Sequence, residues 1–211
     1  MKSHWRKIAS LLPISIEKRI YKIHFRSMHN KWAVKEKSFP PSHLLKQDLL
    51  KQYANADNLK VLVETGTYMG DMIFAMQEHF EKIFSIELAP HFYQRAVNRF
   101  KNIKNVKILE GDSGRVLNKL VPQIDEPALF WLDGHYSGGL TAKGEKDCPV
   151  YDELSHILSS PFKHTILIDD ARLFVGANDY PTIDELKEFV LKRRPNARFE
   201  LKNDAIIITY K

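Results

Sequence analysis

Apolar and polar residues are grouped along most of the chain in blocks that predict strands and helices in alternation. Five short apolar runs have the length of buried strands, and between them apolar residues recur three or four positions apart, as on one face of a helix. The expected strands are 60–64, 83–87, 106–110, 128–133 and 165–169, and the expected helices are about 71–80, 90–101, 113–120 and 149–159. Such alternation predicts a parallel sheet with helices on both faces.

The C-terminal segment follows a different pattern. Thr182 and Glu185 have the spacing of a capping box, which predicts one more helix. Two further strands, 197–201 and 205–210, are separated by three residues, too few for a crossover helix. The sequence therefore predicts an α/β fold whose mostly parallel, seven-stranded sheet ends in an antiparallel hairpin.

The N-terminal segment carries most of the positive charge. Residues 1–38 contain ten Lys and Arg against two Asp and Glu, whereas the rest of the chain is slightly acidic despite the overall net charge of +6. Two short helices are expected on either side of Pro13, the first with Trp5, Ile8, Leu11 and Leu12 on one face and the second with Ile16, Ile20, Tyr21 and Ile23. We therefore expect a basic helical extension over residues 1–41 and a sheet domain over residues 42–211.

The sequence is compatible with several roles for this extension. Basic residues mixed with apolar ones suit a helix on an anionic membrane, or an arm that packs on a partner subunit in a homo-oligomer. The plainer alternative is a pair of helices that cover the end of the sheet domain. No apolar run approaches the roughly 18 residues of a membrane span, and charges interrupt any signal-peptide core. We expect a cytoplasmic protein, with residues 1–38 as a candidate for peripheral membrane contact.

The turn after the first expected strand has the chemistry of a ligand site. The stretch VLVETGTYMG places Glu64 at the strand end and Gly66 and Gly70 in the turn before a helix. Glycine lets the backbone approach a ligand closely, and a helix start offers unpaired N–H groups. The spacing E-x-G-x-x-x-G differs from the phosphate-binding G-x-G-x-x-G, and an acid here suits a positively charged ligand such as S-adenosylmethionine. An ordinary strand-to-helix turn is the alternative.

Acids also follow the next two strands. Glu87 ends the second strand, 21 residues after Gly66, and could accept hydrogen bonds from ribose hydroxyls. Asp112 follows the third strand and could contact an adenine amino group, while Ser113 could cap the next helix. Each acid alone could be a helix cap or a solvated charge. Together they are expected at one edge of the sheet, because ligands of open α/β sheets bind at the carboxyl ends of the strands.

With these residues the chain resembles the S-adenosylmethionine-dependent class I methyltransferases over about residues 58–211. The resemblance implies a Rossmann-like methyltransferase fold for residues 42–211. It also implies that a set of strand-end residues surrounds the methyl donor: Glu64, Gly66, Thr67, Gly70, Glu87, Asp112 and Ser113.

Three carboxylates follow the fourth and fifth strands. Asp133 comes after ALFWL, and Asp169 and Asp170 come after TILI. Like charges this close repel one another unless a cation holds them, and carboxylate oxygens suit Mg²⁺, Ca²⁺ or Mn²⁺. The sequence therefore predicts a divalent metal site, most simply for magnesium. The alternative is that one Asp caps a helix and another pairs with Arg172. The single cysteine, Cys148, excludes a disulfide framework and a Cys-based zinc cluster.

The segments LDGH and IDD resemble the metal-dependent O-methyltransferases, particularly the macrocin O-methyltransferase type, which acts on sugar hydroxyls of antibiotics. The resemblance places Mg²⁺ on Asp133, Asp169 and Asp170 and a general base at His135. Histidine stands where an acid is common in relatives, and the loop 136–147 is glycine-rich and basic. These departures affect the expected acceptor more than the expected chemistry. The loop is expected to be a lid over the acceptor or a plain surface loop.

The function expected from these residues is magnesium-dependent methylation of a sugar hydroxyl on a glycan or glycosylated small molecule, as in polysaccharide assembly. A bound metal would lower the pKa of the hydroxyl, and His135 would take its proton. One alternative is a nucleic-acid methyltransferase that uses the basic extension, although the chain has no Asn/Asp-Pro-Pro-Tyr motif and no RNA-binding module. Another is a membrane-associated binding protein with this fold and no turnover.

Overall fold

Seven strands form one sheet in the order β3-β2-β1-β4-β5-β7-β6. The structure is a computed structural model that describes residues 12, 14–35, 39–134 and 148–210. The strands are β1 (Val61–Thr65), β2 (Lys82–Glu87), β3 (Val106–Glu110), β4 (Ala128–Leu132), β5 (Thr165–Ile168), β6 (Ala197–Lys202) and β7 (Ala205–Tyr210). Strands β1 to β5 pair in parallel, and β7 runs antiparallel to β5 and β6. The predicted sheet and its terminal hairpin are confirmed.

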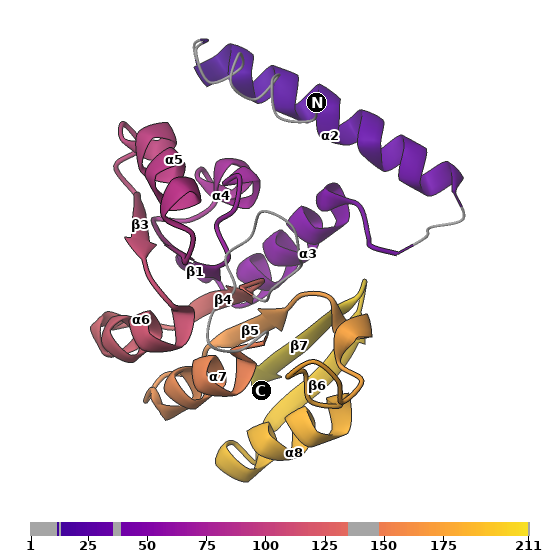
Figure 1. The fold of residues 1–211 in the computed structure, drawn as a ribbon, viewed down its shortest axis with the longest axis vertical. Helices are drawn as coiled ribbons and strands as arrows, with labels where there is room; N and C mark the ends of the chain where they lie inside the picture. The colour runs from indigo at the N-terminus through magenta and orange to yellow at the C-terminus, as the bar shows by residue number, and fades with distance from the viewer. Residues whose placement is uncertain (1–11, 13, 36–38, 135–147, 211) are drawn as a thin grey trace. The chain divides into compact units, whose positions relative to one another are not determined.

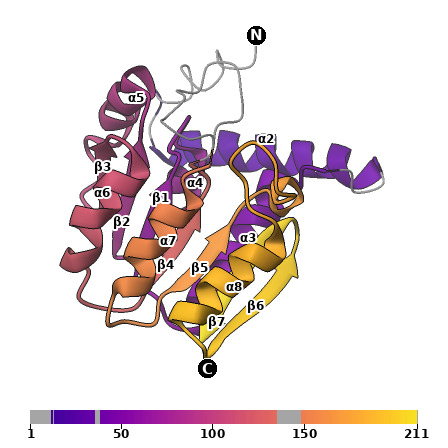
Figure 2. The same cartoon turned by 60° about the horizontal axis from the view of Figure 1, so that its bottom comes forward.

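Helices cover both faces of this sheet. Figures 1 and 2 show α6, α7 and α8 on one face and α4 and α5 on the other. Their bounds are α4 (Asp71–Met76), α5 (Pro90–Phe100), α6 (Ser113–Leu120), α7 (Val150–Ser159) and α8 (Ile183–Arg193), with short 3₁₀ turns η1 (Val121–Gln123) and η2 (Ala171–Leu173). The sheet order reverses between β1 and β4, and an open α/β sheet binds ligands at such a reversal.

The central strands are buried on both faces, as continuous apolar runs predict. Every residue of β1, β4 and β5 is buried, including Phe130 and Trp131 at 1 % exposure or less. Between the sheet and α6, α7 and α8 lies the main apolar core. Burial of this kind contributes about 25 cal/mol for each Å² of apolar surface, so the sheet forms a rigid base for the residues at its ends.

Helix α4 is shorter than predicted. It ends at Met76, four residues before the expected end at Phe80. The side-chain amide of Asn105 donates hydrogen bonds to the carbonyl oxygens of Gln77 (2.9 Å) and Phe80 (2.8 Å), and His79 closes a tight turn onto Met76. These contacts satisfy carbonyls that lack helical partners, so the chain can leave the helix early. At α8, by contrast, the predicted capping box is present, because Thr182 and Glu185 cap each other's backbone.

Two compact units divide the chain, Met1–Leu49 and Leu50–Lys211. The boundary lies inside α3 (His43–Ala56), whereas the sequence places it after residue 41; that division stays a prediction. In the first unit a single helix, α2 (Ile14–Val34), follows Pro13. The first of the two expected helices lies almost wholly outside the described residues.

The apolar residues expected on one face of this second helix differ in burial. Ile16 and Ile23 are exposed, and the buried residues are Glu17, Tyr21 and Phe25, four positions apart. The ring of Phe25 stacks on His43 with centroids 4.4 Å apart within the same unit. Aromatic stacking thus contributes to the burial of Phe25. Among the described residues, no helix is both long and apolar enough to cross a bilayer.

Candidate functional site

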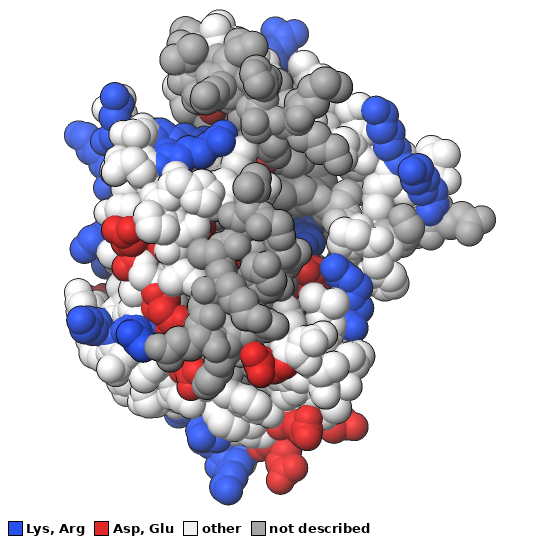
Figure 3. Space-filling view, in the orientation of Figure 1, with Lys and Arg blue, Asp and Glu red and all other residues white. Residues whose placement is uncertain are grey.

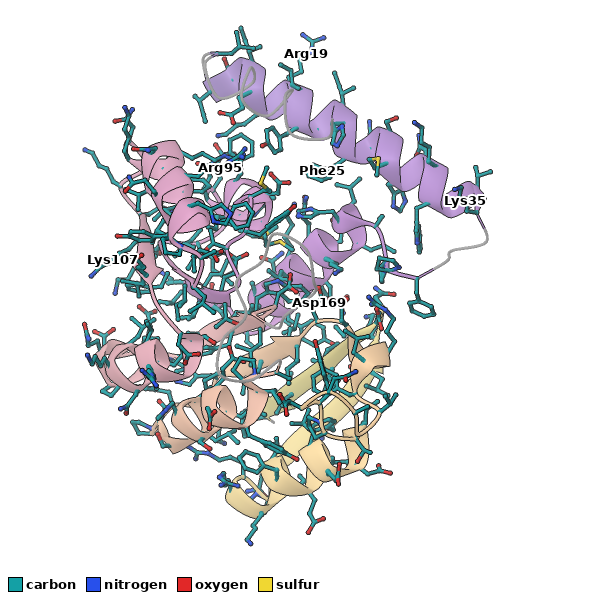
Figure 4. The ribbon with its side chains drawn as sticks, viewed as in Figure 1. Arg19, Phe25, Lys35, Arg95, Lys107 and Asp169 are labelled. Atoms are coloured by element: carbon teal, nitrogen blue, oxygen red, sulfur yellow. The ribbon has the colours of Figure 1, made fainter. Side chains whose placement is uncertain are left out.

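The predicted site residues that the structure describes lie at or near the carboxyl ends of the parallel strands. In the sheet register, Thr65 pairs with Ile86 on one side and Leu132 on the other, and Leu132 pairs with Ile168. The residues that follow these positions are therefore neighbours. Backbone hydrogen bonds join Asp133 N to Thr65 O (3.1 Å) and Asp169 N to Leu132 O (3.0 Å). Figure 4 labels Asp169 at this edge.

Glu64 lies inside the sheet domain, next to the glycine turn. Its side chain is 2 % exposed and accepts a hydrogen bond of 2.5 Å from the Ser85 hydroxyl on β2. Burial raises the pKa of the Glu64 carboxyl well above its usual value, the Ser85 hydrogen bond opposes this, and the charge of Asp133 adds to it. A cationic group at this position would therefore be stabilised by the carboxylate and would favour its ionised form.

The turn from Gly66 to Gly70 is held closely against its neighbours. Gly66 has φ +84°, and a Cβ built on it would lie 2.2 Å from the backbone oxygen of Asp133. Thr67 is buried, with its hydroxyl 2.6 Å from that of Ser85. Gly70 precedes α4 and donates its N–H to Thr67 O at 2.8 Å. The backbone that follows β1, at Gly66, is therefore in close contact with the backbone that follows β4, at Asp133.

Glu87 is oriented by backbone hydrogen bonds. Its two carboxylate oxygens accept from the N–H groups of Tyr68 (2.7 Å) and Ala89 (2.8 Å), and the residue is 7 % exposed. Each oxygen keeps a further lone pair, which leaves room for two ribose hydroxyls as donors. The arrangement also fixes the Tyr68 end of the glycine turn to the end of β2.

Asp112, not Ser113, caps α6. The Asp112 carboxylate accepts from Arg115 N at 3.1 Å, which corrects the expectation that Ser113 would be the cap. Ser113 is instead buried at the first turn of the helix. The cap occupies one Asp112 oxygen, so the other can still accept a hydrogen bond from an adenine amino group.

Three carboxylates come together at the ends of β4 and β5. One oxygen from each of Asp133, Asp169 and Asp170 lies within 4.8 Å of the other two. Asp170 adopts the left-handed conformation (φ 55°), which turns its side chain differently from that of the preceding Asp169. Oxygens that bind Mg²⁺ at about 2.1 Å are at most about 4.2 Å apart, so a modest closure of this cluster fits the ion.

The ion pair considered as an alternative is also present. Arg172 Nη1 donates to Asp170 Oδ1 at 2.7 Å and to the Asp204 carboxylate of the β6–β7 turn. Asp204 in turn accepts from the backbone N–H of Arg172 (2.9 Å), and its carbonyl accepts from Ala171 N (2.7 Å). The terminal hairpin therefore orients Asp170.

The predicted base cannot be placed in this geometry. His135 and the expected lid 136–147 lie outside the described residues, and Gly134 is the last residue before them. A Cβ on Gly134 would lie 3.0 Å from the Thr65 hydroxyl and 3.4 Å from Glu153 Oε1. Gly134 therefore lies in a narrow space between Thr65 at the end of β1 and Glu153 on α7.

Sequence reasoning missed one contributor to this edge, Arg99, and indicated a second, Glu153, as a residue that could line the pocket. Arg99 on α5 has a side chain only 8 % exposed; it donates to Met69 O at 2.5 Å and pairs with Asp71, and so fixes the glycine turn from outside. Glu153 on α7 is 2 % exposed and lines a small cavity with Gly134. A Glu at a core position of an amphipathic helix was the available signal. Burial raises the pKa of the nearby Cys148 thiol to about 12, so it is not a nucleophile at neutral pH.

Solved structures of methyltransferases share this fold. The O-methyltransferase from Bacillus cereus in complex with SAH matches with a TM-score of 0.59 and 12% identity, covering 89% of this chain and 90% of that one. The SAH-bound Podospora anserina methyltransferase PaMTH1 matches with a TM-score of 0.55 and 19% identity over 85% and 86%. The O-methyltransferase TomG from Streptomyces achromogenes, involved in tomaymycin synthesis and solved with SAM, matches with 0.52 and 13% identity over 89% of both chains.

These likenesses establish the Rossmann-like methyltransferase fold for this chain. No protein-family model matches the sequence, and no curated protein matches it either. At such low identity a shared fold does not carry an activity with it. The case for function therefore rests on the residues at the edge of the sheet.

Proposed function

We propose that the protein is an S-adenosylmethionine-dependent O-methyltransferase that requires a divalent metal, most simply Mg²⁺, and acts on a sugar hydroxyl of a glycan or glycosylated small molecule. One observation carries the proposal. Two sets of acidic residues lie at the same edge of the sheet. The first is the buried Glu64 and Glu87 beside the glycine turn, and the second is the three-carboxylate cluster of Asp133, Asp169 and Asp170. The backbone contact at Gly66 joins them.

The first group is suited to the methyl donor. S-adenosylmethionine supplies a methyl group on a cationic sulfur, and with its ammonium and carboxylate it has a net charge of about +1. Glu87, held by the N–H groups of Tyr68 and Ala89, would accept hydrogen bonds from the ribose hydroxyls. The buried Glu64 would favour the cationic end of the ligand, and Asp112 the adenine.

The second group is suited to a hard cation and an oxygen acceptor. A divalent cation bound by Asp133, Asp169 and Asp170 would supply a Lewis acid that lowers the pKa of a hydroxyl. The Arg172 and Asp204 contacts orient Asp170 toward the cluster. His135 would accept the proton of the hydroxyl, since imidazole is a base near neutral pH. The residues at this edge would then act mainly by alignment of the two reactants.

Calorimetry tests whether the protein binds the methyl donor, and a methyl-transfer assay tests whether the reaction requires the metal. The first measurement is S-adenosylmethionine binding to the full chain and to Glu87→Gln, whose amide would place a donor against a backbone N–H. The matched control is Glu110→Gln, an exposed acid in register with Glu87 at the end of β3. We expect at least about tenfold weaker binding for Glu87→Gln and no change for the control.

The second measurement is methyl transfer to candidate glycans and glycosylated small molecules, with and without EDTA, followed by Mg²⁺ re-addition. We expect EDTA to abolish transfer and Mg²⁺ to restore it. Absence of S-adenosylmethionine binding would refute the enzyme assignment altogether. Transfer that resists EDTA would refute the metal alone, and transfer to phenols but not sugars would refute the acceptor class.

A further inference from the structure

Helix α2 has an exposed aliphatic stripe on the side away from its buried aromatic residues. Ile16, Ile23 and Val34 are 46 %, 61 % and 84 % exposed. With about 100° between successive residues, these three side chains project within about 20° of one direction. Tyr21 and Phe25, which are buried, project from roughly the opposite side. Three exposed aliphatic residues therefore share one side of the helix over five turns, with the polar Ser27 and Asn30 between Ile23 and Val34, and we take this side as a candidate binding surface.

Basic residues flank this stripe. Arg19, Arg26 and Lys31 are exposed and project within about 80° on either side of it. Figure 4 shows Arg19 and Phe25 on opposite sides of the helix, and in Figure 3 Lys and Arg side chains stand along the visible part of the segment drawn as α2 in Figure 1. Glu17 is the one acid within α2, and it is buried at 6 % exposure. The exposed charge of α2 is therefore entirely positive.

We propose that this face of α2 binds the surface of an anionic lipid bilayer, with the helix axis in the membrane plane. Ile16, Ile23 and Val34 would enter the boundary between headgroups and acyl chains, while Arg19, Arg26 and Lys31 contact lipid phosphates and carboxylates. The helix is too polar to span a bilayer, which agrees with a position on the surface. The proposal does not depend on the methyltransferase activity, because the stripe belongs to the first unit.

Charge and shape favour a bilayer over two other occupants. Nucleic acid would neutralise the basic residues but would leave the three aliphatic side chains in water. A second copy of this helix would bring like charges together along the full stripe. An anionic bilayer is the surface that satisfies both the aliphatic and the basic residues at once.

Co-sedimentation with vesicles tests the proposal, with S-adenosylmethionine calorimetry and circular dichroism as checks that each variant is folded. We expect the full chain to bind phosphatidylcholine vesicles that contain 30 mol % phosphatidylserine, roughly the anionic content of many membranes, and not pure phosphatidylcholine vesicles. The double substitution Ile16→Ser with Ile23→Ser should weaken binding at least about tenfold. Arg19→Gln with Arg26→Gln should weaken it about 25-fold at low salt, at about fivefold for each charge.

A matched control lies on the same helix. Ile14 and Met28 are also exposed, at 45 % and 51 %, but they project more than about 100° away from the stripe. Ile14→Ser with Met28→Ser should change vesicle binding by less than about twofold. Equal loss in stripe and control variants would overturn the proposal, as would equal binding to neutral vesicles. Two other results would also overturn it: a dimer that only the stripe variant dissociates, or tighter binding to double-stranded RNA than to anionic vesicles.

Discussion

Replacement of Gly66 by alanine tests how tightly the donor turn is packed against the metal cluster. Gly66 has φ +84°, and an added Cβ would lie 2.2 Å from the carbonyl oxygen of Asp133 and 2.7 Å from the carbonyl carbon. A left-handed conformation costs a non-glycine residue about 1–2 kcal/mol. The clash is with backbone, so relief requires β1 and β4 to separate by nearly an ångström, at about 1–3 kcal/mol more. We expect Gly66→Ala to lower the free energy of unfolding by about 2–5 kcal/mol.

Gly176 provides a control that separates the two contributions. It has a similar φ of +80°, but its added Cβ would lie 3.1 Å from a methyl group of Thr182, a side-chain contact that can adjust. Gly176→Ala should therefore cost only the left-handed penalty of about 1–2 kcal/mol. Urea denaturation followed by circular dichroism gives both free energies, and calorimetry gives S-adenosylmethionine affinity for the folded fraction.

The two glycine variants should also differ in ligand binding. Movement of the Asp133 carbonyl would disturb both acid groups, so Gly66→Ala should lose S-adenosylmethionine and Mg²⁺ affinity together, while Gly176→Ala keeps both. Equal stability losses in the two variants would refute the reasoning, because they would show that β1 and β4 separate without cost. So would a Gly66→Ala protein with unchanged affinity for both ligands.

Two further predictions concern the metal cluster and the pH dependence of stability. Asp169→Asn should weaken Mg²⁺ binding in calorimetry at least about tenfold, whereas Asp125→Asn, at a side chain 83 % exposed, should leave it unchanged. Burial, then the charge of Arg194, lowers the pKa of His164 from 6.5 to about 4, so the unfolded chain binds a proton that the native state excludes. The free energy of unfolding, measured in urea titrations, should therefore keep its full value above pH 6.5 and fall by up to about 3 kcal/mol toward pH 4. The same decline in a His164→Gln protein would show that another group causes it.

Much of the sheet was predictable because its signals are local. Strands β3 and β7 have the predicted bounds, β1 is shifted by one residue at both ends, and each of the other four strands differs by one residue at one end. Asp133 and Asp169 directly follow the buried strands β4 and β5, and parallel pairing brings the ends of β1, β4 and β5 together. The proximity of Asp133 and Asp169 therefore follows from the pairing of β4 with β5. The alternation of strands and helices implied that the strands are parallel, and the resemblance to class I methyltransferases implied the plan of the sheet.

The contacts that orient these acids were not predictable, because they join distant positions. Ser85 reaches Glu64 only because β1 and β2 pair in one particular register, and the sequence does not state that register. Likewise, Arg172 was considered as a partner of Asp170, but its second partner, Asp204, comes from a turn more than 30 residues later. For α2, the spacing of the apolar residues did not predict that the acidic Glu17 is buried together with Tyr21 and Phe25.

The electrostatics of the edge favour ligand binding over a structural role for its acids. Buried carboxylates are costly unless something compensates them, and stability alone would favour apolar replacements. Arg99 compensates Asp71, and Arg172 compensates Asp170 and Asp204. Glu64 still has a pKa raised by burial and by neighbouring carboxylates, so its ionised form is not fully stabilised in the ligand-free chain. A cationic donor and a divalent metal are ligands that would supply this missing charge.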